Sequence, residues 1–191
     1  MKKIGVLALQ GAFIEHISMF RKLGVAASPV RLPQELRGLD GLVIPGGEST
    51  TIAKLMQTYN LTEAIQGLVS DGLSVLGTCA GMILLSKNAS QVKLQTMGAI
   101  DIEVRRNAFG RQIDSFEAAL SMPVLGEEPF HAIFIRAPSI TSIGPTVQVL
   151  ARLEDDMGVA ARQEKVLVCA FHPELTDDMR FHRYFMEAVV G

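Results

Sequence analysis

The chain has 191 residues, of which 48% are hydrophobic and 20% charged, so residues 1–191 are expected to form a single domain with one sizeable core. Its 18 basic and 20 acidic side chains leave a net charge of −2, which argues against a nucleic-acid partner because no basic surface would neutralise a phosphate backbone. The longest apolar stretch, residues 73–85, is interrupted by polar residues and glycines. It is shorter than the roughly 20 residues that cross a bilayer, so no membrane partner is expected.

The amino terminus begins like a signal peptide, with Lys2 and Lys3 before an apolar run over residues 4–9. That run is too short for a signal sequence, and Gln10 ends it without a clean cleavage site. We therefore predict a buried first strand. Cys79 and Cys169 are too few for a disulfide framework, and a cytoplasmic location is expected.

The first half of the chain alternates between strand and helix patterns. In chain order, the hydrophobic pattern predicts a strand at 3–9, a helix at about 14–23, strands at 30–32 and 40–44, helices at about 49–56 and 62–71, a strand at 73–76 and a helix at about 80–87. This rhythm is typical of a parallel sheet covered by helices on both faces.

After residue 95 the pattern changes to short strands with brief turns. These are predicted at 100–104, 113–119, 131–136, 147–153, 159–162 and 166–171, and an amphipathic helix follows Thr176. We expect an α/β fold, a three-layer α/β/α sandwich whose mostly parallel central sheet is extended by mixed or antiparallel strands. Ligands of such sheets bind at the carboxyl ends of the parallel strands.

A cysteine lies in a glycine-flanked turn between an apolar strand and an apolar helix, in the sequence Gly77-Thr78-Cys79-Ala80-Gly81. This pattern is typical of a nucleophile elbow, where little bulk is tolerated beside the reactive side chain and the helix N-terminus stabilises a thiolate. The alternative is a small apolar cysteine packed at a turn. Cys169, inside an apolar strand, is interpreted as inert core.

A reactive cysteine needs a base, and the base needs an orienting partner. His172 and Glu174 follow the predicted strand at 166–171 directly, so they lie at a carboxyl end, where the carboxylate can accept the imidazole N–H. The other histidines, His16, His131 and His182, are interpreted as surface or packing residues. Contact between Cys79 and His172 is not visible in the sequence.

The segment from Pro45 to Thr50 follows another predicted strand and contains Gly46 and Gly47. Two glycines before a helix expose backbone N–H groups suited to an oxyanion hole or an anion cradle. No Gly-Lys-Ser/Thr follows, which excludes a P-loop, and the alternative is an ordinary strand–turn–helix with a serine cap. No cluster of cysteine, histidine and acidic residues has metal-ligand spacing, so no metal and no cofactor are expected.

Together these motifs resemble class I, triad-type glutamine amidotransferases and, more narrowly, the glutaminase subunits of two-component pyridoxal 5′-phosphate synthases. The stretches that carry the resemblance occur in order over nearly the whole chain. They are Leu9-Gln10-Gly11-Ala12 with Glu15-His16, Pro45-Gly46-Gly47-Glu48-Ser49-Thr50-Thr51, Gly77-Thr78-Cys79-Ala80-Gly81, Arg106-Asn107, Phe109-Gly110-Arg111-Gln112, Asp114-Ser115-Phe116-Glu117, Phe134-Ile135-Arg136-Ala137-Pro138 and Phe171-His172-Pro173-Glu174-Leu175-Thr176.

The resemblance implies a role for individual residues. Cys79 would be the nucleophile, His172 the base and Glu174 the group that orients it. The backbone N–H groups of Gly47 and Ala80 would form the oxyanion hole. The glutamine site would be lined by Gly47, Glu48, Ser49, Arg106, Ile135 and Arg136. Gln10 belongs to a segment that, in this family, reports docking of the partner to the oxyanion hole.

The implied activity is hydrolysis of L-glutamine to L-glutamate and ammonia, with the ammonia passed to a synthase subunit that makes pyridoxal 5′-phosphate from a pentose phosphate and a triose phosphate. Two alternatives remain open from the sequence. One is another cysteine amidase or peptidase on the same fold. The other is a non-catalytic amidotransferase-like regulatory module, which loss of the cysteine, histidine or glutamate would favour.

Overall fold

The computed structural model describes residues 2–90, 94–106, 115–154 and 156–191. The motif residues Asn107, 109–112 and Asp114 therefore lie outside the described residues. The strands are β1 (Lys3–Leu7), β2 (Ala26–Val30), β3 (Gly41–Ile44), β4 (Ser74–Thr78), β5 (Ser86–Ser90), β6 (Ile100–Arg105), β7 (Ser115–Leu120), β8 (Phe130–Ile135), β9 (Ser139–Ile143), β10 (Gln148–Arg152), β11 (Gly158–Gln163) and β12 (Val166–Cys169). The helices are α1 (Phe13–Lys22), α2 (Ser49–Thr58), α3 (Leu61–Ser70), α4 (Ala80–Leu85) and α5 (Arg180–Tyr184), which continues as the π-helical segment η4 (Phe185–Val190); the short 3₁₀ turns are η1 (Pro33–Leu36), η2 (Pro123–Leu125) and η3 (Pro173–Leu175).

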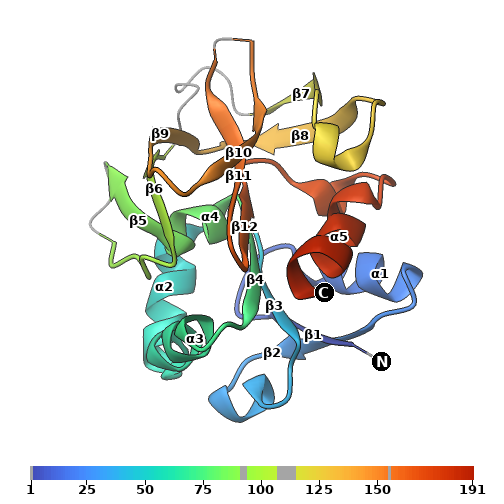
Figure 1. The fold of residues 1–191 in the computed structure, drawn as a ribbon. Helices are drawn as coiled ribbons and strands as arrows, with labels where there is room; N and C mark the ends of the chain where they lie inside the picture. Colours follow the sequence, from blue (N-terminus) through green and yellow to red (C-terminus); the bar gives the residue numbers. More distant parts are fainter. Residues whose placement is uncertain (1, 91–93, 107–114, 155) are drawn as a thin grey trace.

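One large mixed sheet runs through the described part of the chain, in the order β2-β1-β3-β4-β12-β11-β9-β6-β5, with β10 paired to β11. The strands from β2 to β12 are parallel to one another, and the sheet continues through antiparallel pairs from β11 to β6. Helices α2, α3 and α4 cover one face, and α1, α5 and η4 cover the other (Figure 1). The expected α/β architecture, with a parallel half extended by antiparallel strands, is confirmed.

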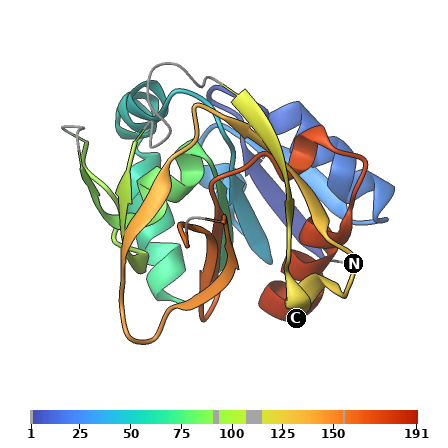
Figure 2. The same ribbon diagram turned by 90° about the horizontal axis from the view of Figure 1, so that it is seen from above.

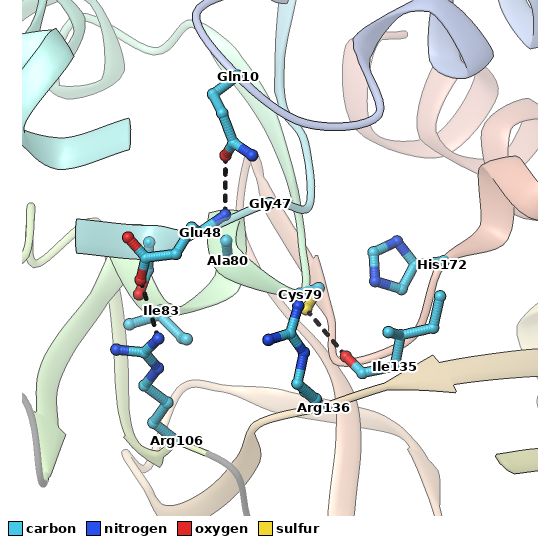
Figure 3. A pocket seen from close by; sticks show the side chains of 11 residues that line it. Gln10, Gly47, Glu48, Cys79, Ala80, Ile83, Arg106, Ile135, Arg136 and His172 are labelled. Carbon is cyan, nitrogen blue, oxygen red and sulfur yellow. Dashed lines mark hydrogen bonds and ion pairs between the residues drawn. The ribbon is translucent and has the colours of Figure 1, made fainter. Parts of the chain in front are cut away.

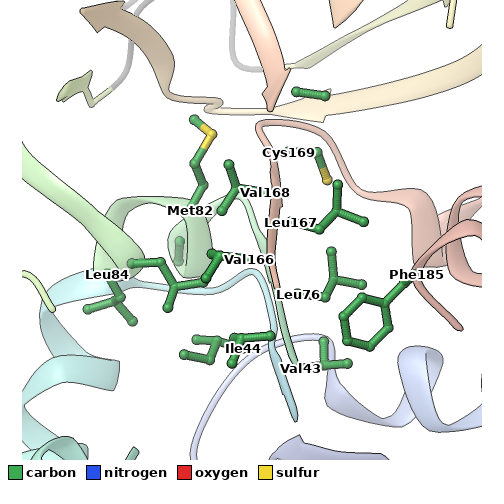
Figure 4. Close-up of a cluster of buried hydrophobic side chains, with 14 of the residues drawn as sticks. Val43, Ile44, Leu76, Met82, Leu84, Val166, Leu167, Val168, Cys169 and Phe185 are labelled. Atoms are coloured by element: carbon green, nitrogen blue, oxygen red, sulfur yellow. The ribbon is translucent and has the colours of Figure 1, made fainter. Parts of the chain in front are cut away.

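The core lies on both faces of the parallel strands. Val43, Leu76 and Leu167 are register neighbours on β3, β4 and β12, and all three are fully buried (Figure 4). The segment η4 contacts β4 and β12 from one side, where its Phe185 is also fully buried. Strands buried on both faces have continuous apolar sequences rather than alternating apolar and polar residues. This is why the hydrophobic pattern of the sequence predicted their positions.

The hairpin β7–β8 forms a separate two-stranded sheet. Viewed from above, it lies beside the C-terminal part of the chain (Figure 2). The backbone N–H of His172 donates to the Ile133 carbonyl of β8 at 2.8 Å, and β8 contacts η3. This pairing brings the end of β8, with Ile135 and Arg136, to the carboxyl edge of the parallel strands.

Two predicted elements were misplaced and one strand was missed. The strand expected at 30–32 is β2 at Ala26–Val30. Pro29 is unusual in a strand and made β2 hard to predict; it is tolerated here because β2 is an edge strand with one unpaired side. The helix expected to reach residue 87 ends at Leu85, and the polar segment Ser86–Ser90 is strand β5, formed by pairing with β6. The strand β9 was not predicted at all. None of the helices in the described ranges combines the length and apolar character needed to cross a membrane.

The junction between β4 and α4 depends on two glycines that allow close backbone packing. A Cβ on Gly81 would overlap the Ile44 carbonyl oxygen of β3, and a Cβ on Gly77 would lie 2.6 Å from Leu85 Cδ1 and 2.8 Å from the Gly81 carbonyl carbon. These contacts let α4 approach the sheet closely enough for Cys79 to occupy the turn between strand and helix.

We expect Gly81→Ala to lower the free energy of unfolding by roughly 1–3 kcal/mol, because the added methyl meets backbone that cannot yield easily. Gly67→Ala is the matched control. Gly67 lies inside α3 with open space around its Cβ position, so the same change is expected to raise stability by about 0.5–1 kcal/mol. Urea unfolding followed by circular dichroism measures both values, and equal effects of the two substitutions would contradict this account.

Candidate active site

The sequence-predicted site residues gather in one pocket at the carboxyl ends of neighbouring strands β1, β3, β4 and β12. Those that line it are Gly47, Glu48, Ser49, Cys79, Ala80, Arg106, Ile135, Arg136 and His172, joined by Gln10 and by Ile83 (Figure 3). Glu174 lies behind His172 and does not line the pocket. Ile83 was not predicted; it lies three residues after Ala80, and this helical spacing was the signal that it faces the same side.

Cys79 forms the turn from β4 into α4. Its backbone has φ 48° and ψ −101°, an unfavourable conformation for a residue with a side chain, and its side chain faces the pocket. The Sγ atom lies 3.8 Å from the Ile135 carbonyl oxygen. Ala80 is the first residue of α4, so its N–H has no intrahelical acceptor. This is the geometry that the nucleophile-elbow pattern predicts.

His172 and Glu174 form a buried pair. His172 Nδ1 and Glu174 Oε1 are 2.7 Å apart, and the Glu174 side chain is fully buried. Burial opposes protonation of His172, but hydrogen bonding with Cys79 and Glu174 raises its pKa to about 10. Gly46 makes room for the ring, because a Cβ there would overlap His172 Cε1 and come within 3.3 Å of Cys79 Cβ. The imidazole is thus held between the cysteine and the carboxylate.

The loop after β3 has three successive N–H groups, two of which are used within the protein. The Gly46 N–H donates to Thr78 Oγ1 at 3.0 Å, and the Glu48 N–H donates to Gln10 Oε1 at 2.8 Å (Figure 3). The Gly47 N–H between them has no acceptor among the described residues. The loop therefore leaves one donor free, at the residue that lines the pocket.

Glu48 caps helix α2 and holds Arg106. Its carboxylate accepts hydrogen bonds from the backbone and hydroxyl groups of Thr50 and Thr51, and its Oε1 lies 2.8 Å from Arg106 Nη2. Partial burial opposes the charged form, but the four hydrogen bonds from Thr50 and Thr51 lower the pKa of Glu48 to about 2. With its oxygens occupied in this way, Glu48 has little capacity left to accept from a ligand.

Two polar side chains in the pocket have no protein partner among the described residues. The Arg136 guanidinium makes no hydrogen bond or ion pair there, and Arg136 itself has a left-handed backbone with φ 43°. The Ser49 hydroxyl is buried and has no hydrogen-bond partner there. A free cation and a free hydroxyl beside Cys79 suit a polar ligand with an anionic group.

The other histidines and Cys169 differ in their exposure and in their contacts. His131 is exposed and pairs with Glu117 at 2.6 Å, and Cys169 is fully buried, where burial raises the pKa of its thiol well above the usual value. His16 and His182 are fully buried, and His16 lies 3.3 Å from Glu174 Oε2. The interpretation of His16 as a surface or packing residue missed this contact, because residues 158 positions apart meet only in the folded chain.

The capping role of Glu48 leads to a stability prediction. Glu48→Ala is expected to cost about 1 kcal/mol at pH 7, the usual loss for removing an N-cap. Because the folded-state pKa of Glu48 is lowered, its contribution to stability is present above about pH 4.5 and is lost as pH falls toward 2. The difference in the free energy of unfolding between the parent and Glu48→Ala should therefore narrow over that range.

Unfolding curves at a series of pH values test this expectation. Glu63→Ala is the matched control, since Glu63 lies exposed in the first turn of α3 with no capping hydrogen bond. The capping role would be contradicted if the free-energy difference between the parent and Glu48→Ala stayed constant from pH 5 downward. It would also be contradicted if Glu63→Ala showed the same pH-dependent decrease in that difference.

Comparisons with known proteins identify the family to which the chain belongs. The model of the SNO glutamine amidotransferase family matches residues 6–191. The curated protein of Herpetosiphon aurantiacus named pyridoxal 5′-phosphate synthase subunit PdxT is 56% identical, over 96% of this chain and 98% of that protein. The protein of the same name from Carboxydothermus hydrogenoformans is 54% identical, over 98% of this chain and 97% of that protein. A crystal structure described as a glutamine amidotransferase superposes with a TM-score of 0.91 at 47% identity, covering 97% of this chain and 98% of that chain. The chain belongs to the SNO glutamine amidotransferase family.

Proposed function

We propose that this chain is the glutaminase subunit of a pyridoxal 5′-phosphate synthase. It hydrolyses L-glutamine to L-glutamate and ammonia and delivers the ammonia to a synthase subunit. The curated relatives that are 54–56% identical carry the name of a subunit of that synthase. The observation that carries the chemistry is the buried His172–Glu174 pair beside a cysteine in a strained elbow.

In the proposed reaction, Cys79 Sγ attacks the side-chain amide carbon of glutamine. The protonated His172 imidazole favours negative charge on Sγ before attack, and it gives its proton to the departing ammonia. The C–N bond breaks and a γ-glutamyl thioester remains on Cys79. Water, deprotonated by the now neutral His172, attacks the thioester and releases glutamate. Glu174 keeps the ring oriented and stabilises the imidazolium.

The oxyanion of the tetrahedral intermediate is proposed to accept from the N–H groups of Gly47 and Ala80. Within the described residues, the Gly47 N–H is the loop donor without a protein acceptor, and the Ala80 N–H is the first orphan donor of α4. The N-terminal end of the α4 helix adds a favourable partial positive charge. Gln10 supports the neighbouring residue by accepting from the Glu48 N–H.

Arg136 is proposed as the main partner of the glutamine α-carboxylate. A guanidinium without a protein partner can make two parallel charge-assisted hydrogen bonds to a carboxylate. Arg106 lines the same pocket but already gives one donor to Glu48, so its remaining donors contribute less. The buried Ser49 hydroxyl and the Ile135 backbone complete the polar wall.

Ammonia is useful as a nucleophile only before water protonates it, so its release calls for an acceptor subunit close by. This is the chemical reason for a hetero-oligomer with a synthase subunit. A cytoplasmic location fits the proposed nucleophile, because reducing compartments keep thiols free. The alternative amidase or peptidase activities fit less well, since an internal peptide bond or a simple amide brings no α-carboxylate to pair with Arg136.

Cys79→Ala is expected to abolish glutamine hydrolysis, measured as glutamate release in the presence of the synthase subunit, because no other group can form the thioester. Cys169→Ser is the control and should leave turnover within a few-fold of the parent. Substantial hydrolysis by the Cys79→Ala protein would remove this residue as the nucleophile.

Arg136→Ala is expected to raise KM for glutamine by at least about tenfold with a smaller change in kcat, because the lost contact is made equally in ground and transition states. Arg106→Ala should raise KM less. The exposed Arg37, which lies away from the pocket, supplies the control variant Arg37→Ala. An unchanged KM in Arg136→Ala would remove this arginine from the substrate site.

A further inference from the structure

Behind the candidate active site lies a buried chain of polar side chains that the reaction above does not use. His16 of α1, Thr78 of β4 and His182 of α5 are all fully buried. His16 Nδ1 is 2.9 Å from His182 Nε2, and His16 Nε2 is 3.2 Å from Thr78 Oγ1 and 3.3 Å from Glu174 Oε2. Buried polar groups are costly unless they are paired, so this cluster calls for an explanation.

The contacts assign the ring protons. A bare Nε2 lone pair on His16 would face the carboxylate oxygen of Glu174 at 3.3 Å, which is repulsive in a buried site. Nε2 therefore carries the hydrogen, which forms the hydrogen bond to Thr78 Oγ1 and lies near Glu174 Oε2. His16 Nδ1 must then accept, and His182 Nε2 donates to it. His182 Nδ1, which has no partner among the described residues, is left as a bare acceptor, which is less costly than an orphaned N–H.

We propose that His16 is a positioning residue that fixes the second oxygen of the Glu174 carboxylate, so that the first oxygen stays aligned with His172; this inference rests on the proposed function. Glu174 Oε1 already interacts with His172 Nδ1, whereas Oε2 is buried and makes no hydrogen bond among the described residues. Its polar neighbour is His16 Nε2, at an ion-pair distance of 3.3 Å. Without the His16 N–H, this buried carboxylate oxygen would lose the polar hydrogen that lies near it and offsets its negative charge. The carboxylate would then rotate or take up a proton, and His172 would lose its orientation.

The two buried histidines act as neutral dipoles. Burial lowers the pKa of His16, although the charge of Glu174 opposes this, and burial lowers the pKa of His182 well below the usual value. The titratable groups around His16 are His182 from α5, Glu174 and His172 after β12, and Glu15 on its own helix. A neutral donor holds Glu174 without cancelling the negative charge that supports the His172 imidazolium.

The same cluster connects the triad to the oxyanion loop. Thr78 Oγ1, which His16 Nε2 contacts, also accepts the N–H of Gly46. The helix that carries His16 begins after a loop whose Ala12 N–H donates to the Gly46 carbonyl at 3.1 Å. His16 is thus placed to keep Glu174, strand β4 and the loop at Gly46 in fixed positions relative to one another.

The test uses the reactivity of Cys79 in the full chain, without glutamine or a partner. In a Cys169→Ser background, the rate of alkylation by iodoacetamide is measured from pH 5 to 9, which follows formation of the thiolate–imidazolium pair. His16→Leu removes the donor, His16→Gln restores an N–H at the position of Nε2, and His131→Leu is the matched control at an exposed histidine. Circular dichroism confirms that each variant is folded.

In His16→Leu we expect the midpoint of the pH profile to rise by about one unit and the alkylation rate at pH 6 to fall about tenfold, with recovery near pH 9. His16→Gln should stay within about threefold of the background protein. If His16→Leu does not fold, His182→Phe serves instead, since a phenyl ring keeps the edge contact with Phe20 and removes the donor to His16; it should shift the midpoint in the same direction by less.

An unchanged midpoint in folded His16→Leu, an equal loss in His16→Gln, or an equal shift in His131→Leu would overturn the proposal. Hydrolysis measured with the synthase subunit gives the second readout, where kcat should fall about 10–100-fold in His16→Leu with KM unchanged. Failure of the proposed function would be seen separately, as no glutamine hydrolysis by the unaltered chain despite a normal alkylation profile.

Discussion

The site depends on one close contact between backbone segments. The first turn of α4 packs its Gly81 against the Ile44 carbonyl of β3, with no room for a side chain between them. This contact places the N-terminus of α4 directly over the ends of β3 and β4, which are register neighbours in the parallel sheet. It also forces Cys79 into a backbone conformation with positive φ that presents the thiol to the pocket. The strain at Cys79 is held by the fully buried core on which α4 rests.

The electrostatics of the site follow from burying one carboxylate. Glu174 is removed from water, and it remains charged because His172 Nδ1 lies 2.7 Å from one of its oxygens and His16 Nε2 lies 3.3 Å from the other. One donor, His172, is the working imidazole, and the other, His16, comes from the first helix of the chain. Loss of either leaves a buried charge without compensation, so packing of α1 and catalytic geometry are linked.

Sequence reasoning located the three strand ends that carry the chemistry, because each motif directly follows an apolar run. It also grouped Cys79, His172 and the Gly46–Gly47 loop correctly at one edge, since carboxyl ends of parallel strands share an edge. Strands β5 and β2 were harder to predict from the sequence. Their sequences lack the pattern of a buried strand, and they form because neighbouring strands offer hydrogen-bonding edges.

The sequence by itself determined the parallel α/β core, the elbow at Cys79 and the His172–Glu174 pair, because these rest on local spacing and on apolar runs that one strand or one turn can display. Only the tertiary structure decided that Arg106 is held by Glu48 while Arg136 has no partner among the residues that the structure describes. It also decided that the Gly47 N–H has no acceptor in that part of the chain and that His16 lies behind Glu174. Each of these depends on contacts between residues far apart in the chain. Whether a donor or a charge is available at a site is set by what the fold places beside it.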